Sequence, residues 1–149
     1  MEPATILKVV HVLSAITAVG ANLTYAFWLG RAGRDRDRLV WTIEAVRRLD
    51  SRVANPAYIA VLITGIGMVL GGAYSFETGW IAVSIVLYIA TALMGILAFA
   101  PAIRRQLAQA EADPTSEAYA AAARRSNFLG LATTALAVII VVLMVAKPS

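Results

Sequence analysis

Four apolar segments dominate the sequence, and each is long enough to cross a lipid bilayer as a single helix. A transmembrane helix needs about 20 mostly apolar residues to cross ~30 Å of hydrocarbon. Inside lipid only helices and closed barrels satisfy their backbone hydrogen bonds, and the segments show no strand-like alternation of polar and apolar residues. We therefore predict one all-α domain over residues 1–149, a polytopic four-helix transmembrane bundle. Its spans are expected at about 5–29, 53–73, 80–103 and 127–146.

The arginines predict how the bundle is oriented. All eleven lie in two segments, seven between Arg31 and Arg52 and four between Arg104 and Arg125. Because loops rich in lysine and arginine remain in the cytoplasm, we expect both of these loops inside and both termini outside. The arginines account for the net charge of +4, so we expect contact with anionic lipid headgroups and no binding of nucleic acid. The predicted location is the cell membrane, as a multi-pass protein of the prokaryotic inner membrane.

Both arginine-rich loops carry signs of helical extensions. In the first, apolar residues recur at steps of three and four residues, as in an amphipathic helix: Leu39, Ile43, Val46, Leu49 and Val53. Pro56 disfavours helical geometry at Asn55, so we expect a break or kink there. In the second loop, Asp113 followed by Pro114 predicts the start of a helix that continues into the fourth span.

The single histidine, His11, lies in the first apolar segment, about 10 Å below its expected outer edge. An ionisable side chain at membrane depth is costly to bury, so it indicates a functional site. Lys8 lies one helical turn earlier, and both this positive charge and the apolar surroundings favour the neutral imidazole. Neutral imidazole is the form that binds metals. Lys8 itself is expected to reach the headgroups or to pair with an acidic group of a ligand.

Comparing depths at ~1.5 Å per residue places several side chains of other spans near the level of His11. Met68 and Met144 are the thioethers that could ligate a metal together with His11. Ser84 and Tyr88 of the third span lie at the same level, and Asn127 begins a polar stripe on the fourth span. The alternative to a metal site is a neutral His11 that hydrogen-bonds to Ser84, Tyr88 or a backbone carbonyl.

Four stretches resemble the HemJ-like and CopD-like membrane proteins. They are "LKVVHVLSAITAVGANLTYAFWLG", "NPAYIAVLITGIGMVL", "GWIAVSIVLY" and "RRSNFLGLATTALAVIIVVLMVAKP", which look like the first to fourth helices of that group. The chain also resembles a related family of uncharacterised four-helix membrane proteins. HemJ-type enzymes oxidise protoporphyrinogen IX and bind haem b, and the resemblance implies that His11 takes the role of their first-helix histidine.

The sequence departs from the HemJ pattern at two places. Ser84 stands where those enzymes have a lysine, and the segment from Asn127 to Gly130 replaces their Asn-Glu-x-Pro. The resemblance therefore implies the fold and a haem b site, for which the candidate residues are Lys8, His11, Ser84, Tyr88 and Asn127. The two departures count against the oxidase activity.

Three functions remain open from the sequence. The first is a b-haem protein with a redox or tetrapyrrole-related role, in which the iron is five-coordinate, ligated by Met68 or Met144, or shared by two His11 residues across a homodimer. The second is a non-enzymatic membrane scaffold or subunit without a cofactor. The third is a small transporter, which the sequence disfavours because the expected spans contain no carboxylate for proton coupling.

Overall fold

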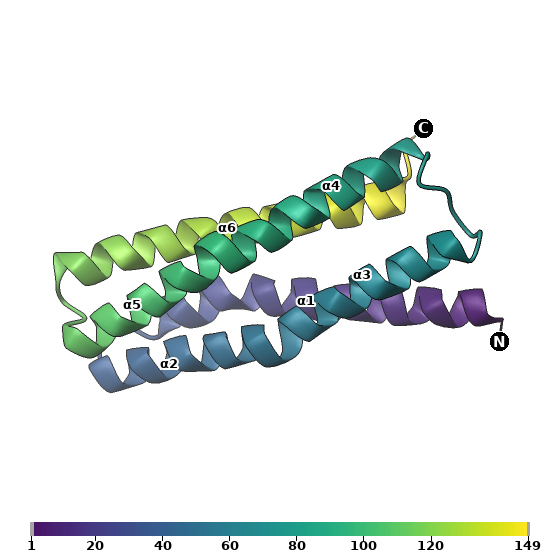
Figure 1. Cartoon of the computed structure of the whole chain (residues 1–149). Helices are drawn as coiled ribbons and strands as arrows, with labels where there is room; N and C mark the ends of the chain where they lie inside the picture. Colours follow the sequence, from purple (N-terminus) through teal and green to yellow (C-terminus); the bar gives the residue numbers. More distant parts are fainter. Residues whose placement is uncertain (1, 149) are drawn as a thin grey trace.

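The computed structural model describes residues 2–148 and is helical over most of that range, with no strand (Figure 1). The first membrane-length helix is α1 (Pro3–Arg31), and the last is α6 (Glu117–Ala146). Between them, α2 (Arg36–Leu49) continues through a π-helical turn into α3 (Asn55–Leu70). In the same way α4 (Gly79–Met94) continues through a second π-helical turn into α5 (Ala100–Ala112). All four continuous helices are long and apolar enough to span a membrane, which confirms the expected all-α four-helix fold.

The two π-helical turns, Asp50–Ala54 and Gly95–Phe99, each lie just before a proline. Pro56 and Pro101 both occupy the first positions of the helix that follows. A proline ring clashes with the carbonyl four residues earlier and offers no N–H to it. The wider turn removes this conflict, since Asn55 N–H bonds to the carbonyl of Asp50, five residues back. Of the expected break or kink at Asn55, the break is wrong: the helix continues, with Asn55 itself in helical geometry, and the disturbance takes the form of the π-helical turn.

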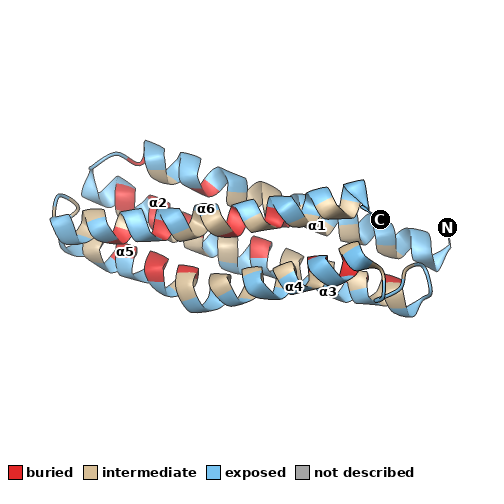
Figure 2. Cartoon of the chain, turned by 90° about the horizontal axis from the view of Figure 1, so that it is seen from above, coloured by how far each residue is buried: buried red, intermediate tan, exposed pale blue. Residues whose placement is uncertain are grey.

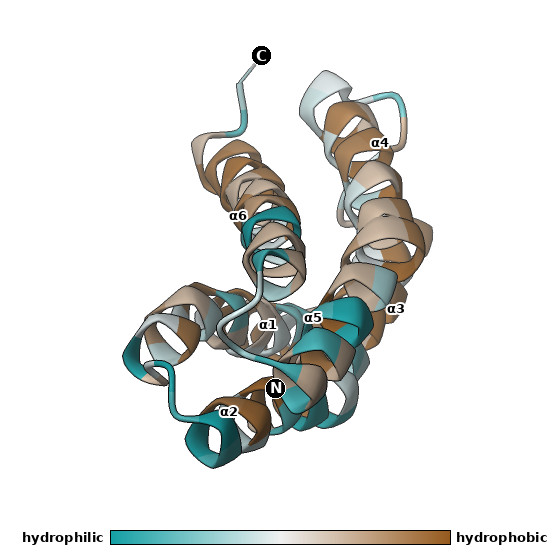
Figure 3. Cartoon of the chain, turned by 90° about the vertical axis from the view of Figure 1, so that its left-hand side faces the viewer, coloured by the Kyte–Doolittle hydropathy of each residue, from teal (hydrophilic) through white to brown (hydrophobic). Residues whose placement is uncertain are grey.

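Both chain ends lie at one end of the bundle, and the arginine-rich segments lie at the other (Figure 1). We call these the terminal end and the arginine-rich end. Viewed from the arginine-rich end, hydrophilic residues gather on the near parts of α2, α5 and α6 (Figure 3). The charged residues are thus kept away from the apolar middle of the bundle, as a membrane position requires.

The tightest core lies toward the arginine-rich end, where buried residues of α2 and α5 gather (Figure 2). Leu39, Ile43 and Val46 of α2 are buried there together with Ile103 and Leu107 of α5. This confirms the amphipathic helix expected in the first loop. Farther along the spans, large apolar side chains such as those of Ile16, Leu70, Val86 and Phe128 are exposed, which is the surface that lipid would cover.

Toward the terminal end the bundle separates into helix pairs. Helix α1 packs on α3, and α4 packs on α6, while α1 also contacts α6. The backbones of α3 and α4, although consecutive in the chain, do not approach each other. The second and third spans therefore diverge from the α2–α5 contact at the arginine-rich end.

Helix α6 begins later than the sequence suggested. Its N-cap is Ser116, whose hydroxyl accepts a hydrogen bond from the N–H of Tyr119 at 3.1 Å. Asp113 instead ends α5 and stabilises the connecting turn, in which its carboxylate accepts from the N–H of Thr115 at 2.8 Å.

Candidate functional site

His11 faces α3, and its hydrogen-bond partner is Thr64. Nδ1 of His11 lies 3.0 Å from Oγ1 of Thr64, which is buried. The imidazole packs against Gly65, because a Cβ added at that glycine would lie only 3.2 Å from Cε1 of the ring. The absence of a side chain at Gly65 thus provides the space for the histidine between α1 and α3.

The hydrogen bonds around Thr64 favour one tautomer of His11. The Thr64 hydroxyl lies 2.6 Å from the carbonyl of Ala60 and 3.2 Å from that of Val61, and donation to either one uses its single hydrogen. It therefore accepts from His11, and Nδ1 of the imidazole carries the proton. Nε2 then has a free lone pair, which is the arrangement of a metal-binding histidine with its other ring nitrogen held in place.

The third-span residues expected beside His11 make their hydrogen bonds elsewhere. Ser84 is buried and donates to the carbonyl of Trp80, one turn earlier on its own helix, at 2.7 Å. Tyr88 donates to the backbone carbonyl of Tyr58 at 2.8 Å. The partner of His11 comes from α3 because α3, and not α4, packs against α1.

The other candidate residues divide between the two halves of the bundle. Met68 is buried on α3, four residues after Thr64 and therefore on the same face. Lys8 is exposed on α1, one turn before His11, and Met144 is half-buried near the end of α6. Asn127 lies near the start of α6, toward the arginine-rich end, and lines a cavity there. Lys8, His11, Met68 and Met144 thus lie in the terminal half of the bundle, away from Asn127.

A cavity of about 500 Å³ lies between the four spans, and all of them contribute to its wall. Its polar groups form a connected set in which Nδ2 of Asn22 donates to the hydroxyl of Tyr58 at 2.8 Å. The hydroxyl of Tyr88 reaches the Tyr58 carbonyl from across the gap between α3 and α4. Among the described residues Oδ1 of Asn22 has no hydrogen-bond partner, and it is buried beside the cavity rather than open to it.

The cavity also contains a carboxylate, that of Asp50 in the first π-helical turn. It accepts hydrogen bonds from the hydroxyl of Tyr25 and from Nδ2 of Asn55, each at 3.4 Å. Among the described residues Asp50 forms no ion pair. Asp50 lies within the membrane-length helix Arg36–Leu70, so the bundle does hold a carboxylate that the expected span boundaries had left outside.

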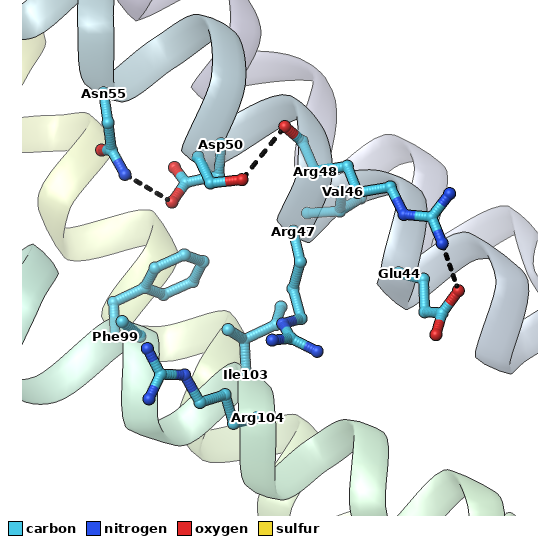
Figure 4. A pocket seen from close by; sticks show the side chains of 11 residues that line it. Glu44, Val46, Arg47, Arg48, Asp50, Asn55, Phe99, Ile103 and Arg104 are labelled. Carbon is cyan, nitrogen blue, oxygen red and sulfur yellow. Dashed lines mark hydrogen bonds and ion pairs between the residues drawn. The ribbon is translucent and has the colours of Figure 1, made fainter.

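A second depression of about 260 Å³ adjoins the cavity at the arginine-rich end (Figure 4). It shares Asp50, Asn55, Phe99, Ala100 and Arg104 with the cavity. In this depression Glu44 pairs with Arg48 at 3.1 Å, while Arg47 and Arg104 point from opposite helices. Asp50 and Asn55 lie at the junction of the two spaces.

Sequence reasoning missed Asp50, Asn55 and Thr64 as site residues. A signal for the first two was present, since Asp50 and Asn55 lie on either side of the segment before Pro56, where a helix must change its hydrogen bonding. Thr64 gave no such signal, because a threonine in an apolar helix usually bonds to its own backbone. Within residues 2–148 no three His, Cys, Asp or Glu side chains come together as a metal-ion site.

Comparison with known proteins gives one family. The model of a family described as "Predicted integral membrane protein (DUF2269)" matches residues 5–148. Searches of curated proteins and of solved structures found no match. The four membrane-length helices agree with the family description, and the match covers nearly the whole chain. The protein belongs to this family of integral membrane proteins.

Proposed function

We propose that this protein binds haem b through Nε2 of His11 and has a redox or tetrapyrrole-related role in the membrane. The observation that carries the proposal is the hydrogen-bond relay from His11 to Thr64 to the Ala60 carbonyl. The relay favours the proton on Nδ1, which would leave Nε2 available to iron. The resemblance of the first helix to the HemJ-like proteins supports the same role for His11.

The side chains around His11 suit such a cofactor. Met68, buried on the α3 face that holds Thr64, is the better placed of the two thioethers to help hold the iron. The exposed ammonium group of Lys8, one turn nearer the terminal end, would pair with a propionate. When bound, haem would supply one-electron redox chemistry, and the residues of this chain would orient it and set its surroundings.

Oxidation of protoporphyrinogen receives less support from the site. HemJ-type enzymes have a lysine where this chain has Ser84. The hydroxyl of Ser84 donates a hydrogen bond to its own helix. No cationic side chain replaces it in that turn of α4. We therefore propose haem binding without assigning this oxidase reaction to the chain.

A cofactor-free scaffold or subunit is the second candidate, and one observation favours it. The hydrogen bond to Thr64 satisfies Nδ1 of His11, so a neutral histidine would also be stable in the bundle without any iron. The two candidates differ only in whether Nε2 holds a ligand.

The visible spectrum of the protein purified in detergent from haem-replete cells separates them. We expect a Soret band that shifts on reduction and disappears in His11→Ala. Thr17→Ala is the matched control, because Thr17 lies on the same helix and its hydroxyl bonds only to the Leu13 carbonyl. A colourless wild-type preparation would refute the haem proposal and leave the scaffold.

The proposal includes a location and an orientation. We place the protein in the prokaryotic inner membrane, with the terminal end outside and the arginine-rich end against the anionic headgroups of the cytoplasmic leaflet. In support, both termini lie at one end and the arginines at the other. A homodimer in which two His11 side chains share one iron remains a variant of the proposal.

A further inference from the structure

The cavity between the four spans is separate from the histidine site. The first residue of α1 that lines it is Asn22, eleven positions after His11, or roughly 16 Å along the helix. What this cavity binds is therefore a separate question from the role of His11.

The cavity holds an acceptor whose charge no ion pair compensates. Among the described residues the Asp50 carboxylate forms no ion pair. The hydroxyls of Tyr25 and Tyr88 use their hydrogens on Asp50 and on the Tyr58 carbonyl. A ligand that complements these groups must bring donors, and a positive charge would compensate the carboxylate.

The rest of the wall is aromatic and apolar. Rings of tyrosine and phenylalanine and branched aliphatic side chains line it: Tyr25, Tyr58, Tyr88, Phe99, Ile59 and Ile96. Aromatic faces attract organic cations, and apolar walls accept a hydrocarbon body. We propose that this cavity binds a small lipophilic amine, whose ammonium group donates to Asp50 and whose apolar body lies among these side chains.

The helix packing indicates the side from which a ligand would enter. The backbones of α3 and α4 do not approach each other, and the hydrogen bond from Tyr88 to Tyr58 joins these helices. A lipophilic amine partitions into the bilayer, so its expected entry is from the lipid, between these two helices. The arginine-rich end is the unfavourable route for a cation, because Arg104 lines both the cavity and the adjoining depression.

The test compares three probes with one body: 4-phenylbutylamine, 4-phenyl-1-butanol and 4-phenylbutyrate. Binding to the full chain in lipid nanodiscs is measured by calorimetry, and empty nanodiscs correct for partitioning into lipid. We expect the amine to bind about tenfold or more tightly than the alcohol, and the carboxylate to bind weakest. Equal affinity of all three probes would overturn the proposal, and so would preferred binding of the carboxylate.

Variants then locate the binding. Asp50→Asn keeps the shape of the side chain and should lower the affinity for the amine to that for the alcohol. Glu44→Gln is the matched control, since Glu44 lies on the same continuous helix, pairs with Arg48 and does not line the cavity.

Arg104→Gln should tighten binding of the amine by removing a like charge. His11→Ala should leave the affinity for the amine unchanged. The outcome of this test therefore does not depend on whether the chain binds haem. An Asp50→Asn protein that is folded and retains wild-type affinity would refute the assignment.

Discussion

At the scale of single residues, the relay from His11 to Thr64 makes a specific prediction. Thr64→Val keeps the shape of the side chain but removes the oxygen that accepts from Nδ1 of His11. We expect haem affinity to fall by about 10- to 100-fold, as when the outer partner of a ligating histidine is lost. Titration of the apoprotein with haem, followed by absorbance, measures this change.

The control for this prediction is Thr133→Val. Thr133 is also buried, but its hydroxyl bonds to the Leu129 and Gly130 carbonyls of its own helix. Its replacement should leave haem affinity unchanged. Equal affinity of wild type and Thr64→Val would mean that the relay does not orient an iron ligand.

His11 could be identified from the sequence because it is the only histidine and lies in an apolar segment. Its partner could not be identified in the same way. Counting residues gives the depth of a side chain in the membrane, and by depth Ser84 was as plausible as Thr64. Which helices are neighbours depends on close packing through small residues such as Gly65, and a single sequence does not specify that pairing.

At the scale of helices, the apolar stripe of α2 predicts where stability is concentrated. Ile43 is fully buried against the α5 side of the core, whereas Val53 of the same stripe is 38% exposed. Ile43→Ala should lower the free energy of unfolding by about 2–5 kcal/mol, since it removes buried methyl groups and leaves a cavity. Val53→Ala should change it by no more than about 0.5 kcal/mol.

Reversible unfolding in detergent, followed by circular dichroism, compares these two variants. Similar losses for both would show that the core at the arginine-rich end does not dominate stability.

The position of Val53 illustrates a limit of periodicity, because the π-helical turn that begins at Asp50 rotates the stripe away from the core. The sequence indicated a disturbance at Pro56. It did not indicate that a π-helical turn would keep the helix continuous there.

The turn between α5 and α6 should depend on pH through Asp113. Hydrogen bonds from the hydroxyl and the N–H of Thr115 lower the pKa of Asp113 from its ordinary value of 3.8. Because the pKa is lower in the folded turn, the stabilisation is present above that ordinary value and is lost as the pH falls through the folded pKa. Hydrogen exchange at the start of α6 should therefore become faster in acid, relative to its intrinsic rate. Asp113→Asn should remove this dependence, and a wild-type profile in that variant would contradict the assignment.

At the scale of the whole molecule, the number of spans followed from the lengths of the apolar segments, whereas their arrangement did not. Lipid surrounds the helices with a medium as apolar as their own side chains, so hydropathy does not select which helices pair. The sequence therefore did not reveal that α3 and α4 stay apart or that Asp50 lies in a cavity between them. The candidate ligand site depends on that arrangement.

The orientation of the bundle can be tested directly, because the chain contains no cysteine. Ser75→Cys places a thiol in the exposed loop between α3 and α4, at the terminal end, and Ala118→Cys places one at an exposed position near the arginines of α6. Since arginine-rich loops are retained in the cytoplasm, a membrane-impermeant maleimide should label Ser75→Cys in intact cells. It should label Ala118→Cys only after the cells are opened. The reverse pattern would place the termini and the Lys8–His11 site on the cytoplasmic side, and any electron or ligand partner of His11 would then have to be sought there.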